Sequence, residues 1–225
     1  MAIVRALAFS LLAALSLAGA AAPFGVRLGL ERIVLDVPPG FTDTTELASP
    51  RLQDLAATLT SDSNRILLFA LTDTDMRRFT QGDPIEARRY LIAVTPKGLE
   101  RERVSAEQFA VLVTDSRRGT GKPVATSDYI KFLESQPIGK VNLFSELKKE
   151  PTVTSVLQAT RQPPQPGTTF WESSKPQYLF FTTTLLLVGG KALRLDVYTT
   201  SVEDIDWLKR ATERWIDDLL RLNAR

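Results

Sequence analysis

The chain has 225 residues, of which 44% are hydrophobic and 24% charged, with a formal net charge of +2. This composition is typical of a globular protein and excludes a disordered chain. The lysines and arginines are scattered in short doublets, which excludes the concentrated basic face that a nucleic-acid partner needs. Cysteine and histidine are both absent. Disulfides, Ser-His-Asp and Cys-His catalysis, and zinc sites built on thiolate or imidazole are therefore excluded, and no cofactor is expected.

The first segment has the pattern of a secretory signal peptide. A basic start, "MAIVR", is followed by the apolar run "ALAFSLLAALSLAGA", with small residues at Ala18 and Ala20 where signal peptidase prefers them. We therefore expect residues 1–20 to be a signal peptide and residues 21–225 to form a single domain that is periplasmic or secreted. No later apolar stretch is long enough to cross a bilayer, so no membrane span is expected after cleavage.

The first half of the mature chain predicts alternating short strands and a helix. Residues 32–38 alternate apolar and polar side chains and stop at two prolines, which is typical of a strand. Residues 49–59 carry leucines at helical spacing behind a serine and a proline, which predicts an amphipathic helix. Compact apolar runs at residues 65–73 and 88–96 predict two buried strands.

Two further helices are expected before a proline-rich middle. Ser105 and Gln108 have the spacing of a capping box and predict a helix from there, and a second helix is expected over residues 127–136, capped by Ser127. Residues 136–176 hold six of the thirteen prolines. Regular structure is expected to be interrupted in that segment, although residues 152–161 have the composition of a strand.

The last third of the chain begins with a predicted β-hairpin. The two glycines at 189–190 suit a two-residue turn, which places Leu186 opposite Leu193 and Leu185 opposite Arg194. The first strand of this hairpin carries apolar residues on both faces. That pattern predicts a central strand covered from both sides.

Residues 201–223 follow as a predicted long amphipathic helix that packs on the hairpin, with Ser201 as its cap. Its apolar stripe consists of Ile205, Leu208, Ala211, Trp215, Leu219 and Leu222. The predicted elements together indicate an α+β fold: a mainly antiparallel sheet flanked by helices on both faces, as in an α/β/α sandwich, closed by a long C-terminal helix.

Two stretches of the sequence resemble a known family. "RIVLDVPPGF" near the start and "LLLVGGKALRLDVYTTSVEDIDWLKRATERWIDDLLRLN" at the end are similar to PsbP-like α/β/α sandwich domains. That family includes uncharacterised secreted bacterial proteins and a nuclear-import factor. The resemblance implies a module that works mostly by binding other proteins, and it assigns no functional residue.

Two short motifs partly match known functional motifs. "RRGTGKP", residues 117–123, lacks the first glycine and the final Ser or Thr of a phosphate-binding loop, so a glycine-rich helix end is favoured. Its side chains Arg117, Arg118 and Lys122 remain the candidate contacts for an acidic protein partner. "SELK", residues 145–148, matches the Ser-x-x-Lys of penicillin-recognising enzymes, but a helix-surface segment is favoured because no Lys-Thr-Gly follows.

A group of carboxylates follows the strand predicted at residues 65–73. Asp73 and Asp75, with Asp83 and Glu86 nearby, could bind calcium or carry out acid–base hydrolysis. Their spacing matches no calcium loop, so we favour backbone hydrogen bonding in a turn.

These observations predict a secreted or periplasmic, non-catalytic binding or accessory protein of the bacterial cell envelope, with an envelope protein as its partner. Two alternatives stay open: a hydrolase that uses Asp73, Asp75 and Asp83, and a carrier of a small apolar ligand held between sheet and helices. Enzymatic activity is not expected, although the sequence does not exclude it.

Overall fold

The computed structural model describes residues 22–45, 47–163 and 177–224. The strands are β1 (Phe24–Leu28), β2 (Glu31–Leu35), β3 (Phe41–Asp43), β4 (Asn64–Thr72), β5 (Arg89–Pro96), β6 (Val141–Glu150), β7 (Val153–Gln162), β8 (Gln177–Val188) and β9 (Lys191–Thr199). The helices are α1 (Pro50–Thr58), α2 (Asp73–Gln81), α3 (Ala106–Ser116), α4 (Tyr129–Glu134) and α5 (Ile205–Leu222), with short 3-10 turns η1 (Lys97–Leu99) and η2 (Val202–Asp204).

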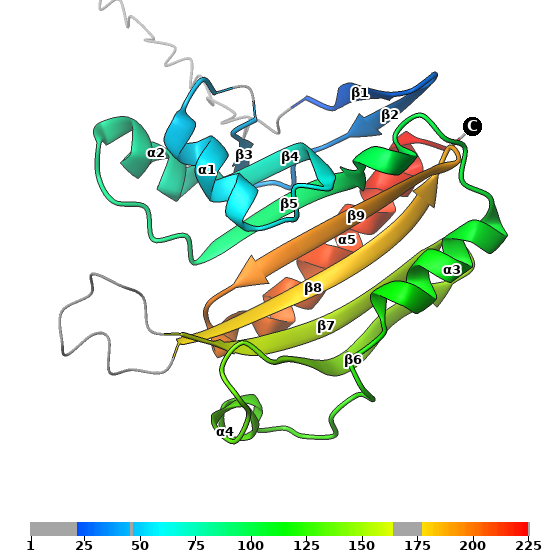
Figure 1. Ribbon diagram of the computed structural model, residues 1–225. Helices are drawn as coiled ribbons and strands as arrows, with labels where there is room; N and C mark the ends of the chain where they lie inside the picture. Colours follow the sequence, from blue (N-terminus) through cyan, green and yellow to red (C-terminus); the bar gives the residue numbers. More distant parts are fainter. Residues whose placement is uncertain (1–21, 46, 164–176, 225) are drawn as a thin grey trace, which may run out of the picture.

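Seven strands form one antiparallel sheet in the order β3-β4-β5-β9-β8-β7-β6, and β1 pairs with β2 in a separate two-stranded sheet. The long helix α5 covers one face of the large sheet, which we call the back face (Figure 1). Helices α1, α2 and α3 lie on the opposite, front face (Figure 1). The predicted α+β fold, with helices on both faces of an antiparallel sheet, is confirmed.

The C-terminal hairpin has the predicted register. Leu186 lies opposite Leu193 and Leu185 lies opposite Arg194. The turn requires glycine because Gly189 and Gly190 both have positive φ, at 57° and 75°. Register in this part of the sheet therefore follows from the turn.

Helix α5 packs on β8 and β9 as expected, but it begins later than predicted. The 3-10 turn η2 precedes it, and the Ser201 side chain makes no capping hydrogen bond. The buried residues of α5 are Ile205, Leu208, Thr212, Trp215, Ile216 and Leu219. Thr212 is accommodated in this apolar stripe because its hydroxyl hydrogen-bonds to the Thr182 hydroxyl of β8 at 2.6 Å.

The expected interruption of regular structure after residue 136 is wrong for residues 141–150, which form β6, whereas the strand composition noted at residues 152–161 is confirmed by β7, which pairs with β6. "SELK" lies within β6 and not on a helix. This strand is at the sheet edge and contains two register irregularities, near Phe144 and near Leu147, so its side chains do not alternate regularly. An edge strand of this kind has no clear period-2 signal, which explains the error.

Helix caps were predicted with mixed success. The capping box of α3 is present: the Gln108 amide donates to the Ser105 hydroxyl, and the Ser105 amide donates to the Gln108 side chain. In α4 the cap is Asp128 and not Ser127, since the Lys131 amide donates to the Asp128 carboxylate at 3.0 Å. Strands β1 and β3 and helix α2 were not predicted from the sequence.

The predicted signal peptide, residues 1–20, lies outside the described residues. Within the ranges that the structure covers, no helix combines the length and the apolar character needed to cross a membrane.

Candidate functional site: an open aromatic groove

The central strand β8 is covered on one face only. From Phe180 onward its back-face residues are buried beneath α5 and its neighbours: Phe180, Thr182, Thr184, Leu186 and Val188. Its front-face residues are only partly buried: Phe181, Thr183, Leu185 and Leu187. The prediction that this strand is covered from both sides is therefore wrong. Helices α1 and α2 reach β4 and β5, and α3 reaches the β8–β9 turn, which leaves the middle of the front face open.

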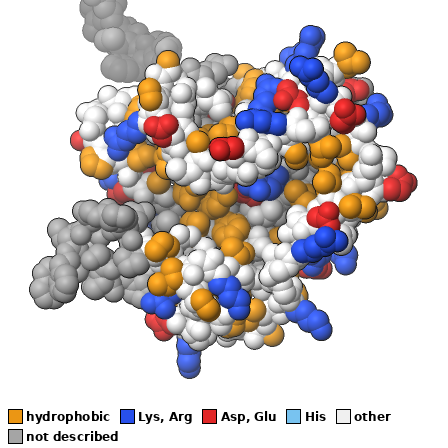
Figure 2. All heavy atoms as spheres, viewed as in Figure 1, with side chains coloured by type: hydrophobic (Ala, Val, Ile, Leu, Met, Phe, Trp, Pro, Cys, Tyr) orange, Lys and Arg blue, Asp and Glu red, His pale blue; other side chains and the backbone are white. Residues whose placement is uncertain are grey.

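A groove of about 970 Å³ lies on this open part of the sheet. Figure 2 shows hydrophobic side chains gathered in a hollow at the middle of the front face. Leu55 of α1 and Leu59, just after its last residue, form one wall, and strands β5, β9 and β8 form the floor. The rim is mainly polar and uncharged, and includes Thr58, Thr160, Gln162, Gln177 and Thr200.

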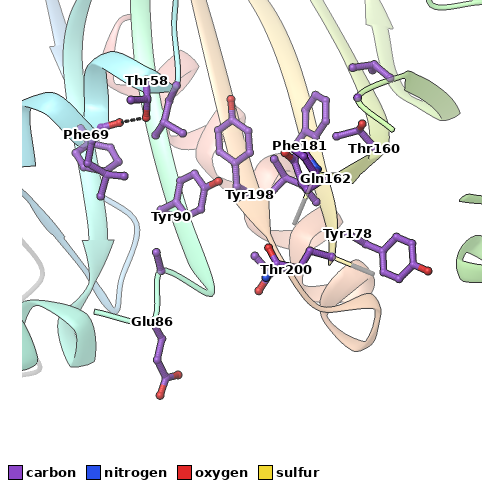
Figure 3. A pocket seen from close by; sticks show the side chains of 18 residues that line it. Thr58, Phe69, Glu86, Tyr90, Thr160, Gln162, Tyr178, Phe181, Tyr198 and Thr200 are labelled. Carbon is purple, nitrogen blue, oxygen red and sulfur yellow. Dashed lines mark hydrogen bonds between the residues drawn. The ribbon is translucent and has the colours of Figure 1, made fainter. Parts of the chain in front are cut away.

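Three aromatic rings from three adjacent strands form the centre of the floor (Figure 3). Tyr198 of β9 lies directly opposite both Tyr90 of β5 and Phe181 of β8 in the sheet register. Its ring stacks on Tyr90 with centroids 4.7 Å apart and on Phe181 with centroids 5.6 Å apart. Cross-strand aromatic pairs stabilise a sheet, and here they line the floor of the groove, where Phe181 is the most exposed ring and both tyrosines are largely buried.

The floor is uncharged at neutral pH. Burial raises the pKa of Tyr90 to about 12. Burial raises the pKa of Tyr198 as well, and the nearby Asp196 carboxylate adds to the effect. Both phenols therefore remain protonated, and the groove centre is suited to apolar groups.

Glu86 is the acidic side chain at the groove edge, and it points away from the aromatic rings (Figure 3). Its carboxylate pairs with Arg78 at the end of α2, with 2.5 Å between Oε1 and Nη1. It therefore contributes no negative charge to the groove centre.

A charged pair lies next to the aromatic row on the same face of β9, outside the lining of the groove. Arg194 and Asp196 share the front face of β9 with Tyr198 because alternate residues of a strand face the same side. The Asp196 side chain is 2% exposed, and its Oδ2 lies 2.8 Å from Arg194 Nε. Burial raises the pKa of the Asp196 carboxyl, against the lowering effect of the Arg194 charge.

The predicted basic contact loop lies at the end of α3, over the front face. Arg117 pairs with Glu146 of β6, and it lines a small hollow with Thr120, Thr183 and other residues of β7 and β8. Arg118 pairs with Asp115 at 3.1 Å but remains largely exposed, and Lys122 is exposed. Arg117 is thus engaged within the fold, while the contact of Arg118 and Lys122 with a partner stays a prediction.

The carboxylates Asp73 and Asp75, proposed as part of a hydrolytic group, accept structural hydrogen bonds at the start of α2, whose N-cap is Thr72. Asp73 accepts a hydrogen bond from the Thr42 hydroxyl at 2.7 Å. Asp75 is buried and accepts from the Thr72 hydroxyl and the Glu86 amide, both at 2.9 Å. Asp83 is exposed. Among the described residues, no group of three or more acidic side chains is arranged to hold a metal ion.

Comparison with known proteins gives a similarity of fold only. No family model matches the chain, and no curated protein matches it. Among solved structures, the chain is similar to the Ran-binding protein Mog1p of Saccharomyces cerevisiae, with 14% identity, a TM-score of 0.39, and coverage of 89% of this chain and 93% of that chain. A mutant of protein Mog1 matches with 15% identity, a TM-score of 0.36, and coverage of 91% and 94%.

Two expectations are corrected by these comparisons. The PsbP-like resemblance is wrong: no such family model matches, and the similar structures are those of Mog1 proteins. The expected role as an accessory protein of the bacterial envelope is wrong on the same finding, because the similar structure with a named role is a Ran-binding protein of yeast. The associated signal peptide, secretion and periplasm gain no support from either comparison.

Sequence reasoning missed the aromatic groove, although one signal was available. The predicted hairpin register, continued five residues from Leu186 and Leu193, places Phe181 opposite Tyr198. Tyr90 could not be added from the sequence, because its strand lies about a hundred residues away and its pairing with β9 is set by the tertiary fold.

Proposed function

We propose that the protein is a binding module that holds a hydrophobic segment of a partner protein in the front-face groove. The observation that carries this proposal is the exposure of β8. Strand β8 buries its back-face residues from Phe180 to Val188, yet it leaves Phe181 and its front-face neighbours partly exposed, next to two stacked tyrosines. Exposed apolar surface on a folded domain marks sites of interaction.

The shape of the groove favours a protein segment as its occupant. Pockets for small molecules enclose most of the ligand surface, whereas this hollow lies open along the front face (Figure 2). A polypeptide can place one or two apolar side chains on the aromatic floor while its backbone contacts the Thr and Gln side chains of the rim. Aromatic residues are also the side chains that contribute most to protein interfaces.

The test is selection of random 12-residue peptides on the immobilised protein, followed by affinity measurements on the selected peptides. The variant Phe181→Ala removes one ring of the floor, and we expect it to weaken binding about 10- to 100-fold, as at interface hot spots. The control is Leu30→Ala, because Leu30 is fully exposed at the tip of the β1–β2 hairpin, outside the groove. Peptides that bind Phe181→Ala as tightly as the unaltered protein would refute the proposal.

A further inference from the structure

The Arg194–Asp196 pair, with its buried Asp196 carboxylate, is a charged feature of the front face that the proposed function does not use. Arg194 lies between Val94 of β5 and Leu185 of β8 in the register. Asp196 lies between Ile92 of β5 and Thr183 of β8. A charged pair in this setting loses hydration, so its presence calls for a compensating role.

Asp196 is placed to hold Arg194 in one orientation. The carboxylate is buried and contacts the guanidinium through Nε at 2.8 Å. Within the described part of the chain the carboxylate oxygens make no hydrogen bond of strict geometry, although the Thr183 and Tyr198 hydroxyls lie close enough to affect the pKa of Asp196. The contact fixes the guanidinium on its Nε side, which makes Asp196 a positioning residue for Arg194.

The outer end of Arg194 is available to a ligand. About a third of the side chain is exposed, and across the described ranges neither Nη atom has a recorded hydrogen bond or ion pair. Two Nη groups in a fixed plane form a fork that matches a carboxylate. A dianionic phosphate fits less well, because the buried Asp196 carboxylate lies next to the same guanidinium.

The Arg194 guanidinium lies at a defined spacing along β9 from the ring of Tyr198. Arg194 is four residues from Tyr198 on the same face of β9, which corresponds to about 13 Å along the strand. We propose that Arg194 recognises a carboxylate of the partner segment, about 13 Å from an apolar side chain that rests on Tyr198 and Phe181. This inference rests on the proposed function and specifies the partner: an apolar residue accompanied by an Asp, a Glu or a C-terminal carboxylate.

The test uses the same peptide selection with two protein variants beside the unaltered chain. Arg194→Gln removes the fork, and the double variant Arg194→Gln/Asp196→Asn also removes the buried charge that would otherwise be left alone. Circular dichroism and thermal unfolding establish whether each variant is folded. If Arg194→Gln does not fold, the double variant is used alone for the binding measurements. Two peptide libraries are used: one with amidated C-termini and one with free C-termini. Comparing them shows whether the recognised carboxylate belongs to a side chain or to the C-terminus.

We expect peptides selected on the unaltered protein to share a carboxylate at a constant spacing from an apolar residue. Replacing that acidic residue by its amide, or amidating the terminus, should weaken binding about 10- to 100-fold. The same replacement should have no effect on binding to the double variant. Added salt should weaken binding to the unaltered protein more than binding to the double variant.

Other outcomes overturn the inference and keep it separate from the proposed function. Peptides without a carboxylate that bind the unaltered protein and the double variant equally, yet lose affinity on Phe181→Ala, would leave the groove function standing and refute the role of Arg194. Failure to select any peptide that is sensitive to Phe181→Ala would refute both.

Discussion

The ring of Tyr198 stacks on the ring of Tyr90 with centroids 4.7 Å apart and planes inclined by 16°, and both phenols are buried. This contact joins β9 to β5 across the floor of the groove. It also links the stability of the sheet to pH, because a buried phenol resists ionisation.

The free energy of unfolding should fall at alkaline pH, in part because the buried Tyr90 phenol ionises less readily in the folded than in the unfolded protein. The pKa of Tyr90 is about 12 in the folded protein and 10.0 for an ordinary tyrosine. Below pH 10 both states keep the proton and the stabilisation is complete; above pH 10 the unfolded state loses its proton first, so the free energy of unfolding falls. Between pH 8 and pH 11, the free energy of unfolding measured with urea should fall by about 1.4 kcal/mol less for Tyr90→Phe than for the unaltered protein. Equal losses would contradict this role.

Asp204 should make the fold sensitive to acid. Its carboxylate accepts from the side chains of Arg88 and Arg89, both bidentate, and from the Thr199 hydroxyl at 2.9 Å. The Arg89 hydrogen bonds, followed by those from Arg88 and Thr199, hold the pKa of Asp204 well below its usual range despite the burial of its side chain. The stabilisation is therefore present above about pH 4 and is lost as pH falls below that value.

Asp204→Asn should lower the free energy of unfolding by about 2 kcal/mol at pH 7, because both arginines lose their charged partner. Asp206→Asn is the matched control: Asp206 is exposed in the first turn of α5 and should contribute about 0.5 kcal/mol through the helix dipole. Denaturation of both variants at pH 7 and pH 3 measures the effect. A difference between Asp204→Asn and the unaltered protein that is as large at pH 3 as at pH 7 would show that the carboxylate charge is not the cause.

Asn223 should attach the β1–β2 hairpin to the end of α5. Its side chain accepts from the Val34 amide at 2.9 Å and donates to the Val34 carbonyl at 2.8 Å, as a neighbouring strand would. Asn223→Ala should cost about 1–2 kcal/mol and speed hydrogen exchange at Val34. Asn223→Asp keeps the acceptor and removes the donor, so exchange at the Val34 amide should remain closer to that of the unaltered protein.

Asp75 should act as a structural cap and not as a catalytic acid. Asp75→Asn disturbs the hydrogen bonds from Thr72 and the Glu86 amide and should lower the free energy of unfolding by about 1–2 kcal/mol. Asp73→Asn should lower it by less than about 0.5 kcal/mol, because the hydrogen bond from Thr42 to Asp73 is exposed. Thermal unfolding of the two variants provides the comparison. Equal effects would show that burial of Asp75 does not matter for capping.

The fold was predictable where local chemistry determines the structure. The glycine turn at 189–190 sets the register of β8 and β9, and the capping box at Ser105 and Gln108 marks the start of α3. Edge strand β6 was not predictable, because its bulges remove the alternation on which strand prediction depends.

The groove was only partly predictable. Apolar residues on both faces of β8 were visible, but whether helices cover both faces depends on where α1 and α3 pack. The pairing of Tyr90 with Tyr198, and the position of Arg194 between β5 and β8, depend on a strand order that brings distant segments together. That strand order cannot be predicted from local sequence patterns.

The most direct measurement is an amide chemical-shift map of the isotope-labelled protein with one selected peptide added. The proposed function predicts the largest changes at Phe181, Tyr198 and Tyr90 and along the groove-facing side of α1, with little change on α5. Changes concentrated on α5 or on the β1–β2 hairpin, with none along β8 and β9 at the groove, would contradict it.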